Sequence, residues 1–104
     1  MSWATPHIEK LARGETVQFR PHGNSMQPKI RSGQLCTVEP LGDYVVERHD
    51  IVLCKVGGSV YLHIVSAIKA DGTSGLYQIS NNKNHINGWV SRSAIYGRLT
   101  KVEP

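Results

Sequence analysis

Apolar residues recur at helical spacing near the start of the chain and then alternate with polar residues in short runs. The segment from Thr5 to Ala12 is predicted to form a helix, because Ile8 and Leu11 share one face. Thr5 is expected to cap its start, and Gly14 is expected to end it. The remaining pattern is typical of strands separated by Gly, Pro and Asp turns.

Six strands are expected, at residues 16–20, 34–39, 51–56, 59–68, 76–80 and 94–102. Gly57-Gly58 joins two apolar runs and predicts a hairpin, since both glycines can take the positive φ of a tight turn. A second turn is expected at residues 70–73, and a polar loop from Asn81 to Gly88. Gly97 interrupts the last strand.

A chain of 104 residues is long enough for one modest core. We therefore predict a single domain over residues 1–104, with an N-terminal helical segment at 1–14 and a β-rich core at 15–104. The expected fold class is mainly β, a barrel or sandwich with one short N-terminal helix. The mean hydropathy of -0.29 is typical of a soluble globular chain.

The formal net charge of +4 first suggests a nucleic-acid partner. The twelve Lys and Arg residues are scattered, however, which argues against that partner. The longest apolar run, from Val60 to Ile68, is much too short to span a bilayer. The first eleven residues contain no apolar signal-peptide region, so we expect a cytoplasmic protein without a membrane anchor.

Cys36 and Cys54 lie in apolar, strand-like stretches and are expected to be buried free thiols. A disulfide between them is the alternative that the sequence leaves undecided. The five histidines show no paired-ligand spacing with each other or with the cysteines. We therefore predict no metal site and no cofactor.

The hexapeptide from Gly23 to Pro28 holds a serine on a constrained turn. Gly23 frees the backbone just before Ser25, and Pro28 restricts it just after. Such a turn can hold a hydroxyl out toward a substrate, and Met26 is expected to pack beneath it. Alone, the hexapeptide is no more than a turn that contains a serine.

The order of several motifs resembles the signal peptidase and LexA superfamily of serine endopeptidases. The hexapeptide is similar to the nucleophile box of that family. Later segments match in order: Ile30 with Ser32-Gly33, Arg48 to Val52, Tyr61 to Val65, Asn81-Asn82, and Ile95 with Gly97-Arg98. The resemblance covers most of the chain from Phe19 to Val102, and it implies a β-rich fold that cleaves a polypeptide bound in extended form.

The resemblance implies that Ser25 is the nucleophile and that His63 is its general base. Many family members use a buried lysine, but no lysine occupies residues 59–68; Lys55, on the preceding strand, is the alternative base. The pairing of a serine with a histidine resembles that of the endoplasmic reticulum and archaeal signal peptidases. The backbone N–H groups of Asn24 and Ser25 would form the oxyanion hole. A lone histidine in an apolar strand is also commonly a core residue.

The group that should orient His63 is missing from its usual place. In the Ser/His branch, an aspartate near the family's later Gly-Asp-Asn box orients the histidine. Here residues 79–82 read Ile-Ser-Asn-Asn, and residues 84–87 contain no carboxylate. Ser80 or Asn82 could orient the ring by hydrogen bonding, without the charge of an aspartate. The nearest carboxylates, Asp50 and Asp71, fit turn or strand-entry positions better. His22, three residues before Ser25, is a further histidine that could reach the site.

Three functions follow from these observations. The first is a small soluble Ser-His endopeptidase acting on a separate polypeptide, since no anchor for signal cleavage is expected. The second is an inactive peptidase-like module that binds a peptide or partner protein, as the missing aspartate suggests. The third is a basic nucleic-acid accessory protein. The sequence does not predict the oligomeric state.

Overall fold

The computed structural model describes residues 3–71 and 74–104 of the chain. Its elements in chain order are α1 (Thr5–Ala12), β1 (Val17–Phe19), β2 (Leu35–Pro40), β3 (Ile51–Val56), β4 (Ser59–Asp71), β5 (Ser74–Ser80), β6 (Ile86–Ser91), a single 3-10 turn (Arg92–Ala94) and β7 (Ile95–Glu103). The prediction of a mainly β fold with one short N-terminal helix is confirmed.

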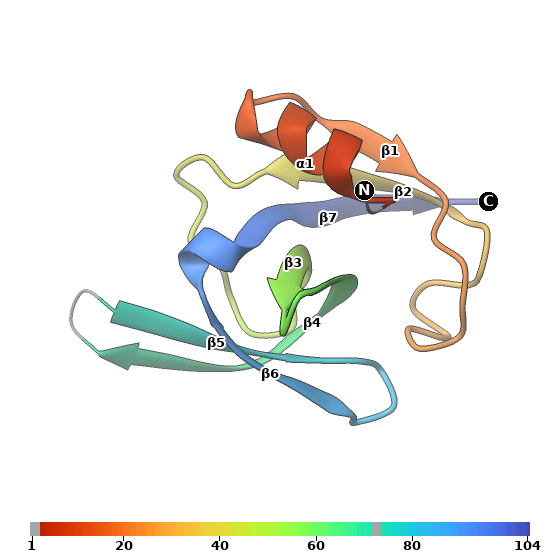
Figure 1. Ribbon diagram of the computed structural model, residues 1–104. Coiled ribbons are helices and arrows are strands. Elements are labelled where there is room, and N and C mark those ends of the chain that lie inside the picture. The colour runs from red at the N-terminus through yellow and green to blue at the C-terminus, as the bar shows by residue number, and fades with distance from the viewer. Residues whose placement is uncertain (1–2, 72–73) are drawn as a thin grey trace.

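All seven strands join one antiparallel sheet in the order β1-β2-β7-β3-β4-β5-β6. Closure into a barrel would require β1 to pair with β6, and these two strands are the free edges of the sheet in the described part of the chain. The sheet is therefore open, which corrects the barrel form of the prediction. Helix α1 lies over β1, β2 and β7 (Figure 1).

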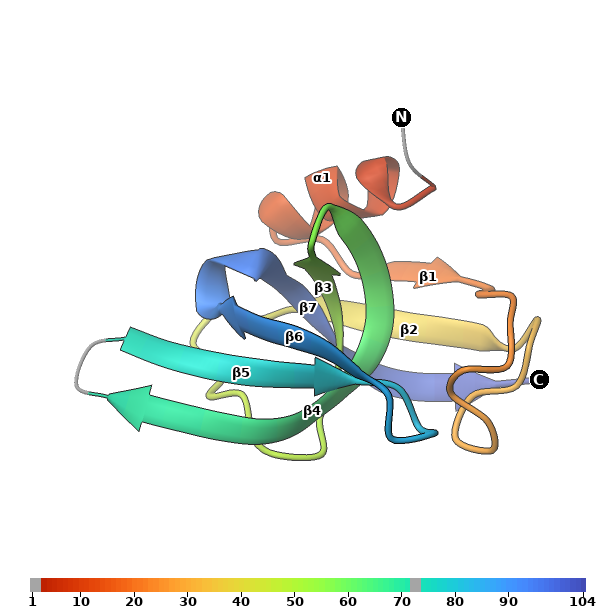
Figure 2. The same cartoon turned by 60° about the horizontal axis from the view of Figure 1, so that its bottom comes forward.

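The sheet carries a hydrophobic cluster on each face, because neighbouring residues of a strand point to opposite sides. On β3, Leu53 packs into the cluster that contains Leu11 of α1 and Met26. Val52 and Cys54 pack into the other cluster, with residues of β5, β6 and β7. The long strand β4 bends as it passes from one half of the sheet to the other (Figure 2).

Helix α1 has the predicted bounds, but its N-cap is Ala4 rather than Thr5. The cap makes no side-chain hydrogen bond. Pro6 lies in the first turn and carries no N–H, so this helix start has one donor fewer to satisfy. Gly14 ends the helix as predicted, with a φ of 82° and its N–H donating to the Leu11 carbonyl over 3.0 Å.

The Gly-Gly hairpin between β3 and β4 is confirmed. Gly57 and Gly58 have φ values of 57° and 86°, and Val56 pairs with Ser59 beside them. The turn predicted at 70–73 includes residues 72 and 73, which lie outside the described residues.

Strand β6 corrects the expected loop over residues 81–88. It begins at Ile86, within the predicted loop, and pairs with β5 from Ile86 to Ser91. Its sequence does not alternate regularly, since Gly88 and Trp89 precede the buried Val90. Pairing with β5, rather than local pattern, is therefore what makes this segment a strand. The loop is shorter than predicted and ends before Ile86.

Cys36 and Cys54 are both buried free thiols, as expected. They lie in different hydrophobic clusters, on opposite faces of the sheet. Burial raises the pKa of Cys54 to about 12, so its unreactive thiol form persists at neutral pH.

Gly97 lies in β7 where α1 packs closest to the sheet. A β-carbon at this position would lie 2.6 Å from the carbonyl oxygen of Glu39 and 3.2 Å from Cδ2 of Leu11. Because backbone cannot yield as a side-chain tip can, Gly97→Ala is expected to lower the free energy of unfolding by about 2 kcal/mol. A thermal melt should show a fall in Tm of about 10 °C.

The matched control for this prediction is Gly75→Ala in β5. A β-carbon there would meet the Tyr77 hydroxyl at 3.2 Å, and that side chain can move away. Its Tm should change little. Equal melting of the Gly97→Ala variant and the wild type would show that β7 does not approach the Glu39 carbonyl and Leu11 as closely as described.

Candidate functional site

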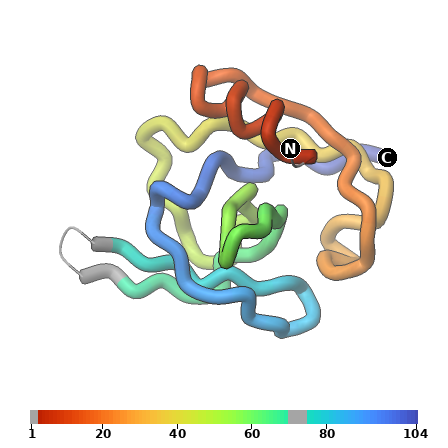
Figure 3. Tube along the Cα trace, viewed as in Figure 1, coloured from red at the N-terminus to blue at the C-terminus, as the bar shows by residue number. Residues whose placement is uncertain are grey.

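The loop between β1 and β2 presents Ser25. This loop leaves the sheet after β1 and folds back on itself before β2 (Figure 3). The Gly33 N–H donates to the Pro21 carbonyl over 2.8 Å and closes the base of the loop. The Gly23 N–H donates to Ser32 Oγ over 3.1 Å, and the φ of 127° at Gly23 is a conformation that favours glycine.

The residues on either side of Ser25 help to hold the turn in place. Met26 is buried and packs into the cluster beneath it, as predicted. The Asn24 side chain accepts a hydrogen bond from Gln27 Nε2 over 3.1 Å. The Gln27–Pro28 peptide bond is cis. Ser25 is half-buried at the top of this turn.

Asn82, a predicted supporting residue, binds the turn at residues 23–28, here called the serine turn, rather than His63. Its N–H donates to the Ser25 carbonyl over 2.9 Å, and its Nδ2 donates to the Gln27 carbonyl over 2.8 Å. These two hydrogen bonds therefore connect the serine turn to the loop that follows β5. This contact joins residues 57 positions apart (82 − 25), a separation that local sequence pattern does not report.

His63 lies on β4 opposite Val52 and is only 7% exposed. Its Nε2 is 3.2 Å from Ser25 Oγ, within hydrogen-bond reach. The ring of Tyr61, two residues earlier on the same face, stacks on the imidazole with 4.7 Å between ring centroids. The structure therefore brings together the two residues that the sequence proposed as nucleophile and base.

Asn87 on β6 completes the arrangement. Its Oδ1 accepts a hydrogen bond of 2.7 Å from His63 Nδ1. An amide oxygen can only accept, so Nδ1 carries the ring hydrogen and Nε2 presents its lone pair to the Ser25 hydroxyl. This is the tautomer that a general base for serine requires. Asn87 was not predicted from the sequence, because the family resemblance implies a carboxylate as the group that orients His63 and this segment contains none.

The alternative base and one candidate orienting group have other surroundings. Lys55, the alternative base, is exposed on β3, opposite Val60. The Asp50 carboxylate accepts hydrogen bonds from the Tyr44 hydroxyl and the Glu47 N–H, both at 2.8 Å.

Three further candidates also have other places in the fold. Ser80 is buried where β4, β5 and β6 pair, opposite Ile64 and Ile86. Asp71 is the last residue of β4, eight positions beyond His63 (71 − 63). His22 is exposed on the serine loop. Among the described residues, Asn87 is thus the group that orients the His63 ring.

Burial lowers the pKa of His63 below its ordinary value of 6.5. The hydrogen bond to Asn87 acts in the opposite direction, and the charge of His85 adds to the lowering. His63 is therefore neutral at physiological pH, which is the form that can take a proton from serine. Asn87 carries no charge, so it orients the ring without balancing the imidazolium that forms during reaction.

The predicted oxyanion donors are free to act. Within residues 3–71 and 74–104, the N–H groups of Asn24 and Ser25 have no hydrogen-bond acceptor. They belong to the same turn as the Ser25 hydroxyl and are available to an oxyanion that forms beside it.

A cleft of about 520 Å³ opens beside Ser25 and His63. One wall comes from the serine loop, including Met26 and Ile30, and the other from Val60 to His63 of β4. Trp3, His7 and Phe19 also line the cleft, and their rings contact each other.

The described residues contain no group of three or more His, Cys, Asp or Glu side chains placed to hold a metal ion. They also contain no helix that is both long and apolar enough to cross a membrane. A search of protein-family models and a search of curated protein sequences each found no match to this chain.

The acid limb of the pH–rate profile tests the environment of His63. Because its pKa is lowered, the neutral base should persist below pH 6.5, and the reaction rate of Ser25 should fall only at lower pH. The measurement is the rate constant for reaction with a fluorophosphonate from pH 4.5 to 8.5. His22→Gln, which alters an exposed histidine of the same cleft, should leave the midpoint unchanged. A midpoint above 6.5 would contradict the assignment of a desolvated His63 as base.

Proposed function

We propose that this protein is a serine endopeptidase in which Ser25 is the nucleophile, His63 the general base and Asn87 the residue that positions His63. One observation carries this proposal: the continuous chain of hydrogen-bond distances from Ser25 Oγ to His63 Nε2, 3.2 Å, and from His63 Nδ1 to Asn87 Oδ1, 2.7 Å. A nucleophile, a base and an orienting group in this order form the arrangement used in acyl transfer.

The proposed reaction has two steps. His63 Nε2 removes the hydroxyl proton as Ser25 Oγ attacks the peptide carbonyl, and the oxyanion is bound by the N–H groups of Asn24 and Ser25. The protonated His63 then gives its proton to the leaving amine, and an acyl-enzyme forms. In the second step, water attacks the acyl carbon as His63 removes its proton; the bond to Ser25 Oγ then breaks, and His63 returns the proton to Oγ. The order of motifs that resembles the signal peptidase and LexA superfamily supports the same assignment, with the substrate a separate polypeptide.

The direct test is hydrolysis of a mixture of unstructured peptides, with the cleavage products identified by mass spectrometry. The wild type is expected to produce a defined set of cleavages, and Ser25→Ala is expected to produce none. Ser32→Ala is the matched serine control, since Ser32 lies in the same loop and accepts a hydrogen bond from Gly23. Cleavage that persists in Ser25→Ala, or no cleavage by the wild type, would refute the proposal.

A second function is favoured by the uncharged Asn87. An amide in place of a carboxylate gives the imidazolium no balancing charge, so the same cleft would bind a peptide without hydrolysing it efficiently. In that case the wild type and Ser25→Ala would bind a peptide equally and neither would cleave it.

A further inference from the structure

A cluster of aromatic rings lines part of the cleft that Ser25 also lines. Trp3, His7 and Phe19 come from the start of the chain, α1 and β1, with 5.3 Å between the ring centroids of Trp3 and Phe19 and 4.8 Å between those of His7 and Phe19. Trp3 remains 52% exposed, although it is a large apolar side chain that packing would be expected to cover. A bulky apolar side chain inserted here would cover these rings.

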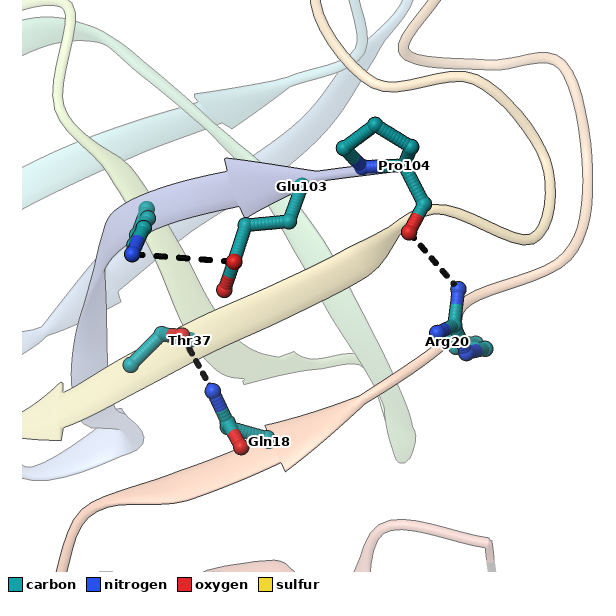
Figure 4. A network of polar contacts seen from close by, with 6 residues as sticks. Gln18, Arg20, Thr37, Glu103 and Pro104 are labelled. Carbon is teal, nitrogen blue, oxygen red and sulfur yellow. Dashed lines mark hydrogen bonds and ion pairs between the residues drawn. The ribbon is translucent and has the colours of Figure 1, made fainter.

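Two cationic side chains line the cleft. Arg20 and Arg31 both belong to the serine loop, between β1 and β2. Arg20 is held in place, because its Nη1 donates to the Gly33 carbonyl over 2.9 Å. The same Nη1 donates to the Pro104 carbonyl over 3.3 Å (Figure 4). Arg31 is exposed, and in the described part of the chain its guanidinium makes no ion pair.

No described aspartate or glutamate lines this cleft. The two ion pairs among the described residues, Arg13–Glu15 and Lys101–Glu103, involve none of the cleft residues. The two arginines make the electrostatic potential at the cleft positive, which favours a ligand with negative charge. The chain as a whole adds to this potential, with a formal net charge of +4.

We propose that the cleft selects extended polypeptides in which a bulky apolar residue, aromatic or branched aliphatic, is flanked by acidic residues. This inference rests on the proposed function, because it takes the cleft beside Ser25 as the peptide site. The apolar residue occupies the pocket of Trp3, His7 and Phe19. The acidic residues pair with the guanidinium of Arg31 and with the guanidinium nitrogens of Arg20 other than Nη1. Planar carboxylates form such pairs well.

The test measures binding rather than cleavage, so it uses the Ser25→Ala variant throughout. Four fluorescent peptides of one length are compared by polarisation: an acidic peptide with a central Phe, the same peptide with Ala for Phe, and two Phe peptides with Gln or Lys in place of the acidic residues. The acidic Phe peptide is expected to bind at least about tenfold more tightly than the Lys peptide. This difference should shrink as salt is raised, because exposed charges are screened.

Two variants separate the two parts of the proposal. Arg31→Gln should weaken the acidic Phe peptide about fivefold and leave the Gln peptide unchanged. Trp3→Ala should remove most of the preference for Phe over Ala. Arg13→Gln is the matched control, since it removes the same charge from an exposed arginine outside the cleft and should change neither preference.

Equal binding of the acidic, neutral and basic peptides would overturn the proposal. Tighter binding of a single-stranded oligonucleotide than of the acidic Phe peptide would also overturn it, because an aromatic and cationic cleft can bind nucleic acid in place of peptide. If Ser25→Ala binds the acidic Phe peptide selectively while the wild type does not cleave it, the selectivity is supported and the proposed hydrolysis fails.

Discussion

Replacing His63 by alanine is expected to slow the reaction of Ser25 with a fluorophosphonate by about 10³-fold, because the hydroxyl loses the base that removes its proton. The rate constant is measured by intact-mass spectrometry at pH 7.5. Added imidazole should restore part of the rate, since the truncation leaves a space beside Ser25 that a free base can enter.

Because His63 is buried, its removal also tests the fold, and His63→Gln provides the necessary control. Glutamine has a similar reach and no basic nitrogen, so it should preserve the fold better than alanine while losing the same activity. His22→Ala, at an exposed histidine of the same cleft, should react at the wild-type rate. Unchanged labelling of both His63 variants would contradict the assignment of His63 as base.

Changes at Asn87 are expected to move the activity in both directions. Asn87→Ala should lower the rate constant about 100-fold, because the ring of His63 loses the group that fixes its tautomer. Asn87→Asp should raise the rate about tenfold, since a charged hydrogen bond to the imidazolium is about twice as strong as a neutral one and about 1.4 kcal/mol corresponds to tenfold.

The pH profile distinguishes this role from a structural one. A carboxylate at position 87 favours the charged imidazole, so Asn87→Asp should move the acid midpoint upward, opposite to the effect of burial at His63. Asn84→Asp, in the loop just before β6 and outside the hydrogen-bonded chain, is the matched control and should not move the midpoint. An Asn87→Asp variant with the wild-type midpoint would show that residue 87 does not act through His63.

Local chemistry accounts for the parts of the fold that the sequence predicted. The bounds of α1 follow from the spacing of Ile8 and Leu11, and Gly57-Gly58 specifies its hairpin by positive φ. Strand β6 was not predicted because its residues do not alternate, and its partner β5 supplies the pairing. Whether the sheet closes into a barrel depends on whether its two edge strands, β1 and β6, pair with each other. The pattern within any single segment does not predict that pairing.

The residues of the candidate site likewise include some that the sequence predicted and some that depend on how distant segments meet. Ser25 was marked by the glycine and proline of its own turn, and His63 by its place in an ordered set of motifs. The contact of Asn87 with His63 depends on how β6 pairs with β5 and on the irregular register between Ile79 and Ser80. Asn82 was expected to be able to orient His63, whereas its hydrogen bonds go to the carbonyls of Ser25 and Gln27, a pairing that depends on how the loops meet in the fold.

The central claim is that the Ser25 hydroxyl is an activated nucleophile, and the site of covalent labelling tests it most directly. The wild-type protein is treated with a fluorophosphonate at pH 7.5, digested and mapped by mass spectrometry, beside Ser25→Ala and Ser32→Ala. We predict one adduct, on Ser25, in the wild type and in Ser32→Ala, and none in Ser25→Ala. An adduct that persists in Ser25→Ala, or a wild type that stays unlabelled, would contradict the account.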